Sequence, residues 1–216
     1  GLVLAGDIDL RLFFKRWHAG FAATDLAANP SNRVQPSLQF FDAHGTAVHK
    51  IFVREATQLA AWHAVIANFT ATEQVMPVFT PPAPPEPVQP DAAIDASSLL
   101  ADWAALQDTH DFFALLNRHG AERQQSFRLA QGVHTQPLAP SAIDALLQNA
   151  ALDATPIMCF VDSPGCIQIH SGPVQRVEPR DIRGERWLNV IDPSFNLHLR
   201  ENDIAQVWRV SKPTVD

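Results

Sequence analysis

The sequence of 216 residues contains no tyrosine, only two cysteines and no long apolar run. The missing tyrosine excludes that side chain as an axial metal ligand or a general acid. Cys159 and Cys166 have neither the number nor the spacing of a disulfide framework or a zinc site, so we expect a reducing compartment. Because no apolar stretch approaches ~18 residues, the sequence predicts no membrane-spanning helix.

Positive charge is also scarce. The formal net charge is -7 and the chain has no run of Lys and Arg, which argues against a surface that binds nucleic acid. The N-terminal stretch lacks the basic residues that open a signal peptide, so we expect a cytoplasmic protein. It also lacks a methionine, which together with the ending Lys-Pro-Thr-Val-Asp suggests a segment of something longer.

The familiar catalytic motifs are absent from the sequence. It has no phosphate-cradling glycine loop, no HExxH, no CxxC pair and no nucleophile elbow. Serine, histidine and aspartate are plentiful, but their spacing assembles no triad. Carboxylate pairs such as Asp7 and Asp9 are interpreted as turn and surface residues.

A proline-rich stretch divides the chain. Seven prolines fall between residues 77 and 90, where they exclude a helix or a central strand and predict a semi-rigid extended spacer. We assign residues 77–95 to this linker, residues 1–76 to a part with strands, a hairpin and a helix, and residues 96–216 to helices followed by antiparallel strands. The predicted fold class is α+β, with antiparallel sheets and covering helices.

Hydrophobic periodicity supports this division. Before the linker it predicts strands over 2–14 and 17–24, a hairpin joining 37–42 to 46–53, and an amphipathic helix over 56–69. After the linker it predicts helices over 99–116, 122–130 and 141–151. Strands follow at 157–161 and 166–170, joined by a type II turn at Ser163-Pro164-Gly165-Cys166, and then at 186–192, 195–200 and 203–210.

A histidine interrupts an apolar row in the helical block. The row has helical spacing and consists of Leu99, Trp103, Leu106, His110 and Phe113. The preceding pair Asp108-Thr109 suits a helix N-cap and predicts a joint between two helices at His110. A neutral imidazole there, with Asp108 and Asp111 close by to orient its other nitrogen, can ligate a metal or a haem iron. The alternative is a hydrogen-bonded core or boundary residue.

Two strand faces carry further candidates. Alternation in the first strand puts Arg11 beside Phe13, a cation next to an aromatic ring, although a solvated strand face would look the same. If Ser163 pairs with Cys166, one face of the later hairpin is an apolar slab made of Met158, Phe160, Ile167 and Ile169. Such a slab suits plain core as well as the wall of a pocket for a planar ligand.

The sequence also contains a weak internal repeat. Aligning residues 7–21 with residues 194–208, an offset of 187, matches Leu10 with Leu197 and Leu12 with Leu199. This offset predicts the back half of one repeat followed by the front half of the next.

Six segments together resemble the cytoplasmic haem-utilisation proteins of Gram-negative bacteria, the HemS/ChuS/PhuS family: residues 7–22, 37–53, 106–130, 156–179, 187–208 and the Lys-Pro-Thr at 212–214. The resemblance preserves their order and covers nearly the whole chain except the proline linker. It implies parts of two tandem copies of a large antiparallel sheet with helices, and one haem held between a helix of the second copy and the sheet of the first.

The resemblance also implies a role for each candidate residue. It makes His110 the proximal haem ligand and places Arg11 on the distal side, where a guanidinium without a lone pair acts through hydrogen bonds. Phe13 would lie near Arg11, and Met158 with Phe160 would line the apolar wall. Arg123 and Lys212 lie where the family keeps cations near the haem propionates.

The function implied is haem binding for haem uptake and iron acquisition. The family is known both for trafficking haem and for degrading it oxidatively; degradation would make Arg11 catalytic and would need a separate electron donor. The expected partners are haem, an inner-membrane haem importer or a haem oxygenase, and a second copy through open sheet edges. Family members begin earlier and continue past residue 216. The alternative is therefore an incomplete structural fragment without haem affinity that folds only by pairing with another chain.

Overall fold

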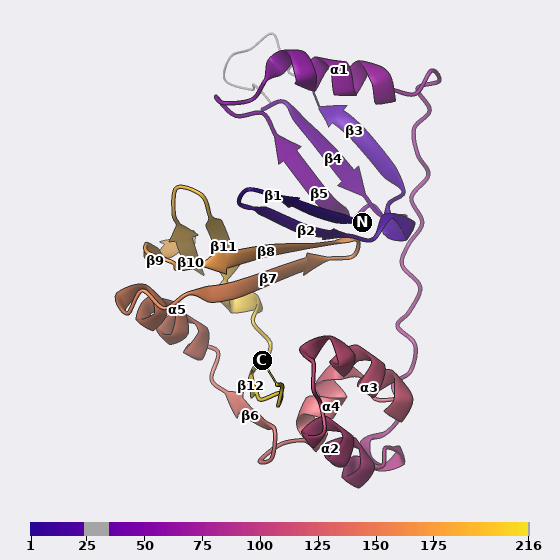
Figure 1. Cartoon of the computed structure of the whole chain (residues 1–216). Helices are drawn as coiled ribbons and strands as arrows, with labels where there is room; N and C mark the ends of the chain where they lie inside the picture. Colours follow the sequence, from indigo (N-terminus) through magenta and orange to yellow (C-terminus); the bar gives the residue numbers. More distant parts are fainter. Residues whose placement is uncertain (24–34, 216) are drawn as a thin grey trace. The chain divides into compact units, whose positions relative to one another are not determined.

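The computed structural model describes residues 1–23 and 35–215 (Figure 1). The chain forms two compact units, one made of residues 1–83 and 157–172, the other of residues 84–156 and 173–216. Both units combine helices with antiparallel sheets, which is the predicted α+β class. Within the described part of the chain, every helix is too short or too polar to cross a membrane.

The first unit contains two antiparallel sheets. The four-stranded sheet has the order β1-β2-β8-β7, with bounds Leu2–Ala5, Ile8–Leu12, Cys166–Gly172 and Ile157–Ser163. The three-stranded sheet has the order β3-β4-β5, with bounds Ala19–Ala23, Ser37–Phe41 and Ala47–Phe52. The 3-10 helix η1 (Phe14–Arg16) precedes β3, and helix α1 (Leu59–Phe69) follows β5.

Two local predictions for this unit were wrong. The strand expected over residues 2–14 is a hairpin, because Gly6 adopts the left-handed conformation (φ 56°) and reverses the chain between β1 and β2. The β7–β8 turn is not type II, since Gly165 lacks the positive φ that this turn requires. Gly165 has a different role: a Cβ there would lie 2.9 Å from the side chains of Trp17 and Val48.

The proline-rich stretch is extended, and its ends are bound to the units they adjoin. The Thr80 amide donates to the Ala43 carbonyl at 2.9 Å within the first unit. The Gln89 carbonyl accepts from the buried Gln125 side chain at 2.6 Å within the second. The freely spanning part is therefore shorter than composition alone suggests.

The second unit begins with a helical core. Helices α2 (Ala96–Ala104) and α3 (Phe112–His119) supply Trp103 and Phe112 to a buried apolar cluster, and helix α4 (Arg123–Leu129) packs against it. The short 3-10 helices η3 (Asp91–Ala93) and η4 (Thr109–Asp111) precede α2 and α3. The Trp103 and Phe112 rings pack edge to face at 4.6 Å between centroids.

Sheets and one further helix complete this unit. Strands β6 (Thr135–Leu138) and β12 (Val207–Val210) pair with each other, and helix α5 (Ala142–Leu152) follows β6. A three-stranded sheet has the order β11-β10-β9, with bounds Asn196–Arg200, Glu185–Ile191 and Val177–Ile182, and η5 (Glu201–Asp203) follows it. The sequence analysis missed β6 and β9. Strand β9 tolerates Pro179 because it lies at a sheet edge.

The two units share one hairpin geometry. The β1–β2 hairpin pairs Leu2 with Arg11, and the β10–β11 hairpin pairs Asn189 with His198. Asn189 lies 187 positions after Leu2, and His198 lies 187 positions after Arg11. The same offset defines the weak sequence repeat. The two hairpins therefore have the same strand pairing, although few of their side chains are identical.

Candidate functional site

His110 lies at a joint between two helices, as the sequence predicts. Helix α2 ends at Ala104, and the Asp108 side chain then caps η4 by accepting from the His110 amide at 2.8 Å. The predicted apolar row is wrong beyond this joint, because the helix does not continue through it. Phe112 enters the core instead, while Phe113 is 66% exposed and the His110 side chain 90% exposed.

Asp108 also binds the His110 ring. Its Oδ1 atom lies 2.6 Å from Nδ1 of the imidazole. The two hydrogen bonds from His110, the backbone one first, hold the pKa of the Asp108 carboxyl below its usual range, so the carboxylate is ionised at neutral pH. Since a carboxylate only accepts, the proton of the neutral imidazole lies on Nδ1, and Nε2 then has a free lone pair. The exposed imidazole is thus in the tautomer that can ligate iron through Nε2.

Two cations of the second unit lie near one another. Lys212 Nζ is 4.2 Å from the centroid of the Phe112 ring. Burial first, and the neighbouring charge of Arg123 second, lower the pKa of Lys212. Among residues 1–23 and 35–215 neither cation has a carboxylate partner in an ion pair. Such a pair of cations suits the binding of carboxylate groups.

The candidates of the first unit share one sheet face. Register pairs Arg11 of β2 with Ile167 of β8, and pairs Phe160 of β7 with Ile169 of β8. Opposite residues point to the same side, so the predicted slab of Met158, Phe160, Ile167 and Ile169 is confirmed and Arg11 lies on it. Met158 and Phe160 are 60% and 59% exposed, which makes this face an accessible apolar surface.

The neighbours of Arg11 complete this face. Asp9, two residues back on the same side of β2, forms an ion pair with the Arg11 guanidinium. The sequence analysis treated Asp9 as a surface carboxylate, although the spacing i, i+2 on a strand could have revealed the pair. Phe13 follows β2, half exposed, and its amide donates to the Gly165 carbonyl at 2.9 Å.

The seven candidates therefore fall into two groups. The first unit brings four of them onto or beside one sheet: Arg11, Phe13, Met158 and Phe160. The second unit contains His110, Arg123 and Lys212, of which the last two lie together. In the described ranges, no three His, Cys, Asp or Glu side chains cluster in a way that could hold a metal ion.

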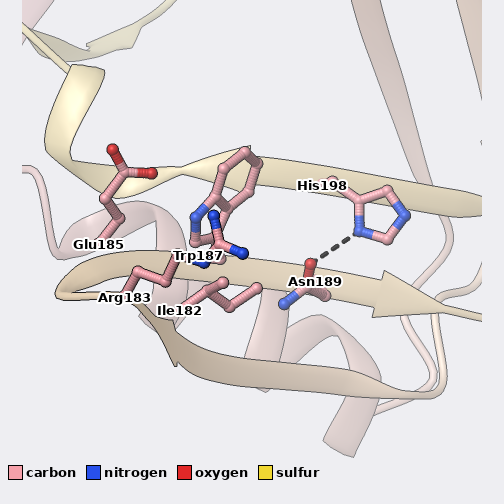
Figure 2. A pocket seen from close by; sticks show the side chains of 6 residues that line it. All are labelled: Ile182, Arg183, Glu185, Trp187, Asn189 and His198. Atoms are coloured by element: carbon pink, nitrogen blue, oxygen red, sulfur yellow. Dashed lines mark hydrogen bonds between the residues drawn. The ribbon is translucent and has the colours of Figure 1, made fainter.

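A separate hollow lies on the three-stranded sheet of the second unit. Figure 2 shows its lining residues, which are Ile182, Arg183, Glu185, Trp187, Asn189 and His198. The Asn189 amide nitrogen donates to the Glu178 carbonyl, so its oxygen accepts from Nδ1 of His198 at 2.7 Å. The sequence analysis selected no residue of this hollow.

Comparison with known proteins places the chain in a family. The sequence model of the haemin-degrading HemS.ChuX domain matches residues 1–69 and 120–216. The chain belongs to the HemS family. The matched ranges include six of the seven candidates, and His110 lies in the unmatched stretch between them.

Individual HemS relatives match the whole chain. It is 38% identical to the hemin transport protein HemS of Yersinia enterocolitica and 37% identical to the hemin transport protein HmuS of Yersinia pestis. In both comparisons it covers 100% of itself and 60% of the relative, so the chain spans about three fifths of their length.

Solved structures of the family show the same fold. Holo-PhuS, a heme-binding protein from Pseudomonas aeruginosa, is 45% identical with a TM-score of 0.90. ChuS, a heme-degrading enzyme from Escherichia coli O157:H7, is 35% identical with a TM-score of 0.84. Each match covers 100% of this chain and 60% of the solved one. The predicted α+β fold class with antiparallel sheets is therefore confirmed.

Proposed function

We propose that this chain binds haem for haem uptake and iron acquisition, and that His110 is the axial ligand of the iron. The observation that carries the proposal is the His110 imidazole, which is exposed at a helix joint with Nδ1 held by Asp108 at 2.6 Å. Relatives named as hemin transport, heme-binding and heme-degrading proteins support it. An imidazole with a free Nε2 is the ligand that haem iron takes from histidine.

The other candidates match what a haem requires of a protein. Haem supplies a redox-active iron within a planar apolar ring that carries two carboxylates. The slab with Met158 and Phe160 offers apolar contact to the ring, and Phe13 adds an aromatic side chain. Arg123 and Lys212 offer positive charge to the propionates.

Arg11 is assigned to the distal side of the iron. Its guanidinium has five N–H donors and no lone pair, so it donates hydrogen bonds there and does not ligate the metal. Asp9 holds this guanidinium on the apolar face, which orients the donors. In oxidative degradation, which needs an external electron donor, Arg11 would be the catalytic residue.

We assign trafficking as the main role and degradation as a second activity. A carrier must pass haem on, and the partners proposed are an inner-membrane haem importer and a haem oxygenase. Outer strands of the described sheets, among them β1, β7, β9 and β11, each pair on one side only, and a homodimer would form through such an edge.

A haemin titration followed by absorbance tests the proposal. Wild type should show a saturable Soret shift, and His110→Ala should abolish or displace it. His63→Ala is the matched control, because His63 is exposed on α1 and belongs to neither group of candidates. A wild type that binds haemin no better than His110→Ala would overturn the proposal and favour the fragment without haem affinity.

Adding ascorbate in air to the haem complex separates the two roles. A carrier keeps its Soret band, whereas a degrading enzyme loses it, and Arg11→Ala should then slow that loss while the complex still forms. Loss of the band at the same rate in wild type and Arg11→Ala would contradict the catalytic role of Arg11.

A further inference from the structure

The geometry points to Asp108 as a positioning residue that fixes both the orientation and the tautomer of His110 for iron ligation. This inference rests on the proposed function and deepens it. It concerns a residue that does not touch the iron and acts only through the imidazole.

One carboxylate oxygen makes both contacts. Oδ1 of Asp108 accepts from the His110 amide at 2.8 Å and lies 2.6 Å from Nδ1 of the ring. The same residue anchors the start of the turn through its backbone, because its carbonyl accepts from the Asp111 amide at 3.1 Å. The oxygen is therefore fixed relative to the backbone of η4, and the ring that it binds is fixed with it.

The fixed proton has a consequence for the other nitrogen. With Nδ1 of the neutral ring hydrogen-bonded to Oδ1 of Asp108 at 2.6 Å, the lone pair of Nε2 points away from Asp108, and the hydrogen bond makes Nε2 a more basic ligand atom. A more basic imidazole stabilises ferric over ferrous iron and lowers the reduction potential. At 90% exposure the ring has few packing contacts of its own, so Asp108 is the main restraint on its direction.

The chain provides a matched control on the other side of His110. Asp111 is the same residue type, one position after the histidine, and its carboxylate makes no hydrogen bond within residues 1–23 and 35–215. A general effect of negative charge near His110 should appear in both Asp111→Asn and Asp108→Asn. A positioning effect should appear in Asp108→Asn alone.

The test compares these variants in the full chain with haemin as the ligand. Asp108→Asn should weaken haemin binding about 10–100-fold, as removal of a carboxylate behind a metal-bound histidine does. It should also raise the midpoint potential of the haem complex and lower the iron–histidine stretching frequency of the ferrous form. Asp108→Ser should change affinity, potential and stretching frequency in the same directions. Because serine keeps an N-cap hydroxyl, loss of the helix cap would not explain these changes.

The outcomes separate this inference from the function on which it rests. If Asp108→Asn and Asp111→Asn behave alike in affinity, potential and stretching frequency, the positioning role is overturned while haem binding stands. If His110→Ala binds haemin as wild type does, the proposed ligand is itself wrong. Circular dichroism melts that superimpose on wild type show that each variant is folded.

Discussion

The β1–β2 and β10–β11 hairpins have the same register and different surroundings. On its second side β2 pairs with β8, so it is an inner strand, whereas β11 lies at the edge of its sheet. At matching positions the first hairpin has Leu2 and Arg11, and the second has Asn189 and His198.

This difference shows how one backbone supports two kinds of surface. In the first hairpin, Arg11 is held by Asp9 and lies on the same sheet face as the exposed Met158 and Phe160. In the second, His198 binds the buried Asn189, which in turn binds the Glu178 carbonyl. Arg11 is thus held by a neighbour on its own strand, whereas His198 is held by a residue of the adjacent strand. Binding capacity therefore cannot be inferred from the repeat alone.

The largest expected loss of stability comes from a substitution in the β7–β8 turn, which precedes the strand β8 that pairs with β2. Gly165→Ala would place a Cβ 2.9 Å from side-chain atoms of Trp17 and Val48. Trp17 cannot easily move away, since its Nε1 donates to the Gly165 carbonyl at 2.9 Å. Overpacking of this kind should lower the free energy of unfolding by about 3 kcal/mol, measured by urea denaturation.

A double-mutant cycle checks the cause of that loss. Val48→Ala removes one of the clashing methyl groups, so the double variant should lose less stability than the sum of the two single variants. Strict additivity would mean that the contact with Trp17, and not the contact with Val48, makes Gly165 necessary.

The next largest loss of stability is expected at Asn189, which matches Leu2 of the first hairpin. Asn189→Ala leaves the Glu178 carbonyl and the His198 ring without their partner, which should cost about 2 kcal/mol of unfolding free energy. Leu2→Ala, at the matching position, should change stability by no more than about 0.5 kcal/mol because Leu2 is exposed. Equal losses of unfolding free energy in the two variants would contradict the difference between the two hairpins.

Much of the fold follows from sequence patterns, and the misses have specific causes. The β4–β5 hairpin, α1 and the slab on β7 and β8 were predicted from short-range periodicity, which needs no knowledge of distant contacts. Strand β6 was missed because its partner β12 lies about 70 residues later in the chain. Gly165 was assigned to the wrong turn because a close approach to Trp17 leaves no local signal.

The candidate site was predictable to a different degree. Spacing identified the joint at His110 and its cap by Asp108, since both depend on neighbours in sequence. The prediction of one apolar row from Leu99 to Phe113 was wrong because it assumed a continuous helix, whereas α2 ends at Ala104. The proximity of Lys212 to Arg123 joins distant segments, so only the resemblance to a family suggested a shared role for them.

The smallest expected effect is a pH dependence in the first unit, where β5 meets the β7–β8 turn. Burial lowers the pKa of His49, whose Nδ1 lies 3.8 Å from Sγ of the buried Cys166. Below a pH of about 6.5 the unfolded chain then binds a proton that the folded chain does not, so stability falls as the pH falls. Relative to His49→Gln, wild type should lose at most about 1.4 kcal/mol per pH unit below that point, and nothing between pH 7 and 8, in urea denaturation. The exposed His63 is the control: a dependence removed equally by His63→Gln would place the proton elsewhere than at this contact.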